Sequence, residues 1–209
     1  MKNKINALSY LIILLSGIIY LPVLAQHQNT TQKATYRLDI KKSKLLWTAP
    51  KNRHKGFILF SSGVLSNLIN GWPTQGAFII NMNSMKSTDM PTADGRKKVD
   101  DELRTENFFA NSKYPTAIMM VNTIMPEHPF GIYKVRGELT IKGTTKPIGF
   151  IATMKQNGNT ITARGTVNIS RSAWNIGHQP PPWDFIARLK DNLVDDDIPV
   201  NLELVFTRK

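Results

Sequence analysis

The chain has 209 residues, no cysteine, and 27 lysine and arginine residues against 15 aspartate and glutamate residues, which gives a formal net charge of +12. Without cysteine it holds no disulfide, no thiol nucleophile and no thiolate metal site. A positive surface attracts anionic lipid, nucleic acid or acidic polymer. The basic residues are spread along the chain instead of forming one run. We therefore expect a solvated cationic surface that makes at most weak electrostatic contact with an anionic membrane.

The N-terminal segment resembles a targeting sequence. Two lysines precede an apolar run over residues 11–24 that ends in small residues, and this pattern predicts a secretory signal peptide over residues 1–25. The run is short for a membrane span and is interrupted by a glycine and a proline. We expect export to a bacterial periplasm, which argues against a nucleic-acid partner. The remaining length suits one domain, over residues 36–209.

The first strands follow a polar lead. Residues 26–35 are polar and aperiodic, which predicts a flexible segment. The apolar residues then recur with a period of two, and strands are expected at residues 36–47, 56–62 and 78–82.

A surface helix is predicted next, at about residues 96–107. Val99 and Leu103 lie four apart and form a narrow apolar seam among charged side chains. Phe108 and Phe109 follow it directly. If they find an apolar pocket, together they bury on the order of 300 Å².

The remaining strands show the clearest alternation. Apolar and polar residues alternate strictly over residues 132–142 and 160–169 and again over residues 200–206, as in strands with one buried face. Further strands are expected at residues 117–121 and 148–154. About eight antiparallel strands satisfy a sandwich or a closed barrel. Closure removes exposed edges, so we favour an all-β, lipocalin-like antiparallel barrel with one short helix packed on it.

No catalytic or metal-binding constellation stands out. The histidines His27, His54, His128 and His178 lack the spacing of a helical metal pair. Residues 195–197 are three aspartates without the ligand spacing of a calcium loop. Paired carboxylates could serve acid–base chemistry. The acidic residues of the predicted helix and its end are Asp100, Asp101, Glu102 and Glu106. Basic neighbours favour surface ion pairing for them, so no enzyme activity, metal or cofactor is expected.

Large apolar side chains are abundant on the predicted strands. Most of them suit an ordinary core, but an eight-stranded barrel is just wide enough to be filled by side chains or to hold one small ligand. The residues expected to line such a cavity are Trp47, Phe57, Phe78, Ile80, Met82, Phe108, Phe109, Met119, Val121, Tyr133, Val135, Leu139, Ile141, Val167 and Trp174.

Five segments give the chain a family resemblance. They are YRLDIKKSKLLWT (36–48), GAFIINMNSM (76–85), KKVDDELRTENFFANSKYPTA (97–117), YKVRGELTIKGTTKPIGF (133–150) and NISRSAWNIG (168–177). In this order they resemble the YceI-like family of exported bacterial proteins. The resemblance implies an extended barrel whose apolar cavity holds an isoprenoid or another amphiphilic lipid, without catalysis or metal. It also implies that the helix and the two phenylalanines cover one side or mouth of the barrel.

Two segments depart from that family. Residues 48–67 lack the histidine-loop-arginine pattern of the quinone-binding members and resemble a Bacteroidetes-type subgroup. Residues 178–200 replace a shorter turn. The resemblance therefore does not identify the lipid.

Three functions are consistent with these observations. The first is an exported, non-catalytic carrier, a monomer or a homodimer, that shields an isoprenoid or other long-chain lipid from water. The second is a filled barrel that acts as a structural or interaction protein docked to anionic envelope components. An enzyme that uses the carboxylates of residues 100–106 ranks last.

Overall fold

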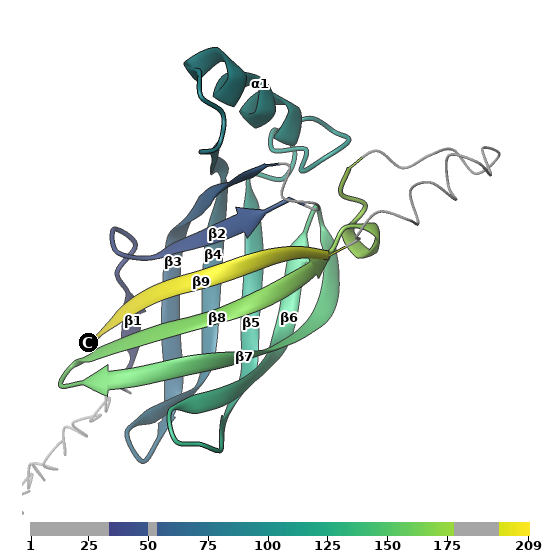
Figure 1. Ribbon diagram of the computed structural model, residues 1–209. Coiled ribbons are helices and arrows are strands. Elements are labelled where there is room, and N and C mark those ends of the chain that lie inside the picture. The colour runs from purple at the N-terminus through teal and green to yellow at the C-terminus, as the bar shows by residue number, and fades with distance from the viewer. Residues whose placement is uncertain (1–33, 50–53, 178–196) are drawn as a thin grey trace, which may run out of the picture. The chain divides into compact units, whose positions relative to one another are not determined.

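A computed structural model describes residues 34–49, 54–177 and 197–209 (Figure 1). The predicted signal peptide, most of the lead, His27, His178, and two of the three aspartates at 195–197 lie outside these ranges. In chain order the elements are β1 (Tyr36–Leu38), β2 (Lys44–Thr48), β3 (Lys55–Ile69), β4 (Trp72–Ser87), α1 (Ala93–Leu103), β5 (Thr116–Glu127), β6 (Ile132–Ile141), β7 (Thr144–Asn157), β8 (Thr160–Ser170), a 3₁₀ turn η2 (Ser172–Trp174) and β9 (Asp197–Arg208). No helix within these ranges is long and apolar enough to cross a membrane.

The strands form a closed antiparallel barrel. Going round it, the order is β3, β2, β9, β8, β7, β6, β5 and β4, and pairing of β4 with β3 closes the ring. Strand β1 also pairs with both β3 and β9. It pairs with a different stretch of these two strands from the stretch that pairs with β2. Nine strands thus fill eight positions, which confirms the predicted barrel of about eight strands with one helix.

The first predicted strand, residues 36–47, is two strands. Between β1 and β2 the carboxylate of Asp39 accepts hydrogen bonds from the backbone N–H groups of Lys41 (3.1 Å) and Lys42 (3.3 Å). An aspartate that binds the backbone two and three residues ahead stabilises a turn in place of a strand. Buried Ser43 then joins the turn to β9, because its Oγ accepts from the backbone N–H of Val205 at 3.0 Å.

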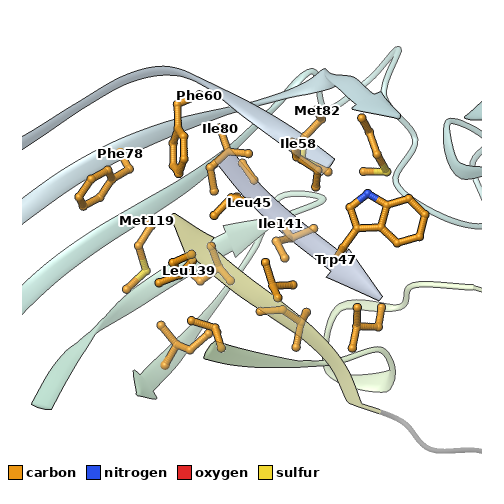
Figure 2. A pocket seen from close by; sticks show the side chains of 18 of the residues that line it. Leu45, Trp47, Ile58, Phe60, Phe78, Ile80, Met82, Met119, Leu139 and Ile141 are labelled. Atoms are coloured by element: carbon orange, nitrogen blue, oxygen red, sulfur yellow. The ribbon is translucent and has the colours of Figure 1, made fainter. Parts of the chain in front are cut away.

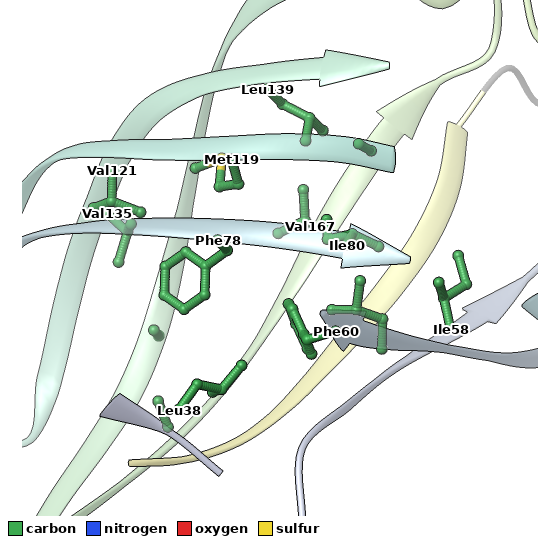
Figure 3. Close-up of a cluster of buried hydrophobic side chains, with 14 of the residues drawn as sticks. Leu38, Ile58, Phe60, Phe78, Ile80, Met119, Val121, Val135, Leu139 and Val167 are labelled. Atoms are coloured by element: carbon green, nitrogen blue, oxygen red, sulfur yellow. The ribbon is translucent and has the colours of Figure 1, made fainter. Parts of the chain in front are cut away.

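Inward-facing residues of the strands form one apolar cluster (Figure 3). Phe78 lies in it with ring-centroid distances of 6.1 Å to Phe60 and 6.0 Å to Phe206. The hairpins β3–β4 and β5–β6 turn at the end opposite α1 (Figure 1). There Trp72 and Tyr133, each beside one of these turns, pack at 5.4 Å between centroids.

Gly56 sets how closely β2, β3 and β4 approach. A Cβ at this position would lie 1.9 Å from the carbonyl oxygen of Lys86 and 2.5 Å from Cζ2 of Trp47. The clash is with backbone as well as with an aromatic ring, so rotation of one side chain does not relieve it.

We expect Gly56→Ala to lower the free energy of unfolding by roughly 2 kcal/mol or more. Gly149→Ala is the matched control, because its Cβ would meet only ordinary contacts, the nearest being 3.6 Å from the carbonyl oxygen of Val135. Urea unfolding of both variants checks the difference. Equal stabilities would show that the strands can separate to admit a methyl group.

Candidate binding cavity

A cavity of about 560 Å³ lies inside the barrel (Figure 2). Its wall takes residues from every strand from β2 to β9. The volume falls within the range of ordinary small-molecule sites, roughly 300–1,000 Å³.

Small inward residues where β7, β8 and β9 meet explain why the barrel is not filled. Ala163 and Gly165 on β8 lie directly opposite Leu204 and Leu202 on β9, and Gly165 lies opposite Ala152 on β7. Both leucines line the cavity, yet they are only partly buried. No bulky neighbour covers them on β8, so part of their surface faces the cavity instead of protein.

The wall is almost entirely apolar. Among the described residues, its ionisable members are His54, Glu102, Arg164 and Arg171. Arg164 is exposed, and it follows inward-facing Ala163 in the alternation of β8. The His54 Nδ1 atom lies 2.9 Å from a carboxylate oxygen of Asp89. Within the described residues, no three histidine or acidic side chains are grouped so as to hold a metal ion.

One end of the cavity is lined by α1 and the segment after it. Val99 and Leu103 on α1, together with Phe108 and Phe109, belong to the wall. The helix begins earlier than predicted, since Thr92 caps it by accepting a hydrogen bond from the backbone N–H of Gly95 at 3.0 Å, and it ends at Leu103 instead of residue 107.

Backbone hydrogen bonds fix the two phenylalanines at this end. The N–H of Phe109 donates to the carbonyl of Leu103 at 3.1 Å. Buried Asn111 donates from Nδ2 to the carbonyl of Met82 at 2.7 Å, and the N–H of Met82 donates to the carbonyl of Pro115 at 3.0 Å. The segment after the helix is therefore attached to β4 on both sides of Tyr114.

Asp100 differs from the expected surface ion pair. It is only 4% exposed, and its carboxylate accepts hydrogen bonds from the backbone N–H of Ser87 at 2.7 Å and from the Lys86 ammonium at 3.1 Å. Burial disfavours its charged form, but these bonds outweigh burial and lower the pKa of Asp100. Asp101 matches the expectation: it is exposed and pairs with Lys97 and Arg104.

Twelve of the fifteen residues expected to line the cavity do so. They are Trp47, Phe78, Ile80, Met82, Phe108, Phe109, Met119, Val121, Val135, Leu139, Ile141 and Val167. The structure brings them together from the strands β2, β4, β5, β6 and β8 and from the segment after α1.

The other three residues lie elsewhere. Phe57 faces outward, because Gly56 and Ile58 on either side of it are buried inside the barrel. Tyr133 packs on Trp72 and is not part of the cavity wall. Trp174 belongs to η2, and its Nε1–H donates to the carbonyl of Thr144 at 3.0 Å.

Sequence reasoning missed part of the wall on β7 and β9. The missed residues there are Ile148, Phe150, Ala152, Met154, Ile198, Val200, Leu202, Leu204 and Phe206. Most of them belong to runs that had been recognised as strands. The alternation of apolar and polar residues in these runs could therefore have identified them as facing the interior of the barrel.

The closed antiparallel barrel, its interior cavity and its covering helix define a lipocalin-like, cavity-bearing protein. Residues 36–206 match the YceI-like domain, and the chain belongs to this family. No match is found among curated proteins.

Two solved structures share the fold. The crystal structure of BcnA from Burkholderia cenocepacia is 25% identical over 80% of this chain and 98% of its own, with a TM-score of 0.64. A polyisoprenoid-binding domain from Saccharophagus degradans, implicated in plant cell wall breakdown, is 16% identical over 82% of this chain and 97% of its own, with a TM-score of 0.57.

Asp100 makes the attachment of α1 to β4 dependent on pH. Its folded pKa is lowered below the unfolded value of about 3.9, so its contribution is fully present above that value and is lost as the pH falls through the folded pKa. We expect Asp100→Asn to cost on the order of 1–3 kcal/mol of unfolding free energy at pH 7 and progressively less below about pH 4.

Urea unfolding at pH 7 and pH 3 measures this difference. Asp101→Asn is the control, since Asp101 is exposed, and it should change stability little at either pH. A cost for Asp100→Asn that stays the same at both pH values would contradict the assignment.

Proposed function

We propose that the protein is an exported, non-catalytic carrier that binds an isoprenoid or another long-chain amphiphilic lipid inside the barrel. The observation that carries this proposal is the apolar cavity of about 560 Å³. The polyisoprenoid-binding domain of the same fold adds support for the class of ligand. The signal-like residues 1–25 support a periplasmic location, and residues 48–67 support a place beside Bacteroidetes-type members of the family.

The hydrophobic effect sets a lower limit on the length of the ligand. One isoprene unit buries four to five CH₂ equivalents, worth roughly 3–4 kcal/mol at about 0.8 kcal/mol each. Loss of rigid-body freedom on binding costs on the order of 4–15 kcal/mol. A ligand of one or two units would hardly bind, whereas a chain of about four or more units could reach micromolar affinity.

The alternative of a filled barrel has less support. A filled interior would bury the inward residues of β9, but Leu202 and Leu204 remain only partly buried beside the cavity. The third function, an enzyme that uses the carboxylates of α1, has even less support. The carboxylates of Asp100 and Asp101 are engaged with Lys86, Lys97 and Arg104.

Filling the cavity from its own wall tests the carrier proposal. Ala163 is 7% exposed and lines the cavity, so Ala163→Phe places a benzyl group where the ligand would lie. We expect lipid retained after export, measured by native mass spectrometry, to fall at least tenfold. The control is Thr162→Phe, which adds the same group at an exposed position. Unchanged loading of Ala163→Phe, or no lipid in the wild-type protein, would contradict the proposal.

A carrier must also meet membranes, and we propose that one outer patch contacts anionic bilayers. This patch comprises Met125, Phe130, Lys134, Arg136 and Ile151. Lys134 lies between Met125 and Ile151 in the register of β5, β6 and β7. Phe130 in the β5–β6 turn is 89% exposed, Met125 42% and Ile151 51%. Exposed apolar side chains among cations suit an anionic lipid surface, where each basic residue contributes about 1 kcal/mol.

Vesicle sedimentation tests this contact. We expect binding to vesicles that contain phosphatidylglycerol but not to pure phosphatidylcholine, and about a tenfold loss for Phe130→Ser. Ile40→Ser is the control, because Ile40 is 44% exposed but lies between β1 and β2, on the opposite side of the barrel from β6. Equal binding by both variants would exclude the patch. A change in oligomeric mass with unchanged vesicle binding would instead make it a contact between copies.

A further inference from the structure

Trp47 carries a buried donor that has no acceptor among the described residues. The residue is 7% exposed and lines the cavity. Its Nε1 atom is buried, and no hydrogen-bond acceptor is within reach among the described residues. Buried polar groups are nearly always hydrogen-bonded, and tryptophan N–H groups usually find a partner. The exception therefore requires a physical explanation.

The position of the indole ring is fixed by the strands. Trp47 lies directly opposite Gly56 in the β2–β3 register. A Cβ at Gly56 would lie 2.5 Å from Cζ2 and 2.7 Å from Cε2 of the ring, so the ring occupies the space that a side chain would fill. Figure 2 shows the indole at the end of β2, among the side chains that line the cavity. The indole ring therefore packs directly against the backbone at Gly56.

Trp174 shows what a structural tryptophan does in this fold. It is 4% exposed, and its Nε1 donates to the carbonyl of Thr144 at 3.0 Å. It does not line the cavity. Two tryptophans of similar burial therefore differ. Trp47 lines the cavity and its indole N–H has no acceptor among the described residues, whereas Trp174 lies outside the wall and its N–H is hydrogen-bonded.

The pairing of β2 with β3 brings a second polar residue of the cavity wall near Trp47. His54 precedes Gly56 by two residues, lines the cavity, and its carbonyl accepts a hydrogen bond from the N–H of Ala49 at 2.7 Å. Its Nδ1 lies 2.9 Å from Asp89, whose pKa is lowered because hydrogen bonds from His54 and the Lys55 N–H outweigh the effect of burial. The Asp89 carboxylate can only accept, so Nδ1 of His54 carries the proton of this hydrogen bond.

We propose that the Trp47 indole N–H donates a hydrogen bond to a neutral oxygen at the polar end of the bound lipid. This inference rests on the proposed carrier function and names the part of the cavity that recognises the head group. A hydroxyl or carbonyl oxygen fits this donor, because an indole N–H carries no charge that could offset the cost of burying an anion beside it. The polar end then lies beside His54, and the hydrocarbon extends along the apolar wall of the barrel.

The test compares ligands that differ by one oxygen. Hexaprenol and squalene have the same number of carbon atoms, and only hexaprenol carries a hydroxyl group. We expect Trp47→Phe to weaken hexaprenol binding about three- to tenfold, the usual range for one lost hydrogen bond, and to change squalene binding by less than about twofold. Any loss of packing affects both ligands alike, so the ratio of the two binding affinities reports the hydrogen bond alone. Trp174→Phe is the matched control and should leave the ratio unchanged.

A measurement on the wild-type protein makes the test independent of how well the variant folds. The ¹H–¹⁵N resonance of the Trp47 indole should shift downfield on addition of hexaprenol and not on addition of squalene. Three results would overturn the inference. The ratio of the hexaprenol and squalene affinities could be unchanged in Trp47→Phe, or the resonance could shift equally with both ligands. Trp47→Phe could also weaken the binding of hexaprenyl phosphate more than that of hexaprenol. If the wild-type protein binds neither chain, the carrier function itself fails. If it binds both equally, only the role of Trp47 fails.

Discussion

Closure of the sheet by the β3–β4 pair is the constraint on which the other features depend. Once the ring is closed, every strand has one face toward a common interior, and the side chains at those positions decide whether that interior is solid. On β4 large residues such as Phe78 and Met82 occupy it. Where β8 meets its neighbours, Ala163 and Gly165 leave space. The cavity follows from this unequal distribution of side-chain size around a ring of fixed circumference.

The helical segment depends on the same ring for its position. Helix α1 connects β4 to β5, two neighbouring strands, so it must return to the barrel end from which it left. The buried Asp100 binds the last residue of β4, and Asn111 binds the carbonyl of Met82 on the same strand. These two contacts place Phe108 and Phe109 in the cavity wall without a second sheet or a disulfide. Polar contacts of Asp100 and Asn111 with β4 therefore hold the apolar side chains of Phe108 and Phe109 in the cavity wall.

The barrel was predicted because closure removes exposed edges. Alternation in the sequence was enough to predict most of its strands and part of the cavity wall. It failed where a strand is apolar at consecutive positions. Residues 57–60 are all apolar, so a period of two cannot show which of them face inward, and Phe57 was assigned to the wrong face. Asp100 and Asp101 are adjacent and identical in type, and Asp100 is distinguished by its bonds to Lys86 and to the backbone N–H of Ser87, thirteen residues away in the chain. Such long-range partners leave no local pattern.

The break between β1 and β2 has a mechanical consequence. These two short strands together occupy the position between β3 and β9, whereas β6 and β7 are paired without interruption from Ile132 to Ile141. Cooperative opening begins where hydrogen-bonded ladders are short. The wall along this seam is therefore held by short ladders, and Trp47 is part of it. A guest thicker than the resting bore would be accommodated by stretching one side of the wall, while the opposite side keeps its shape.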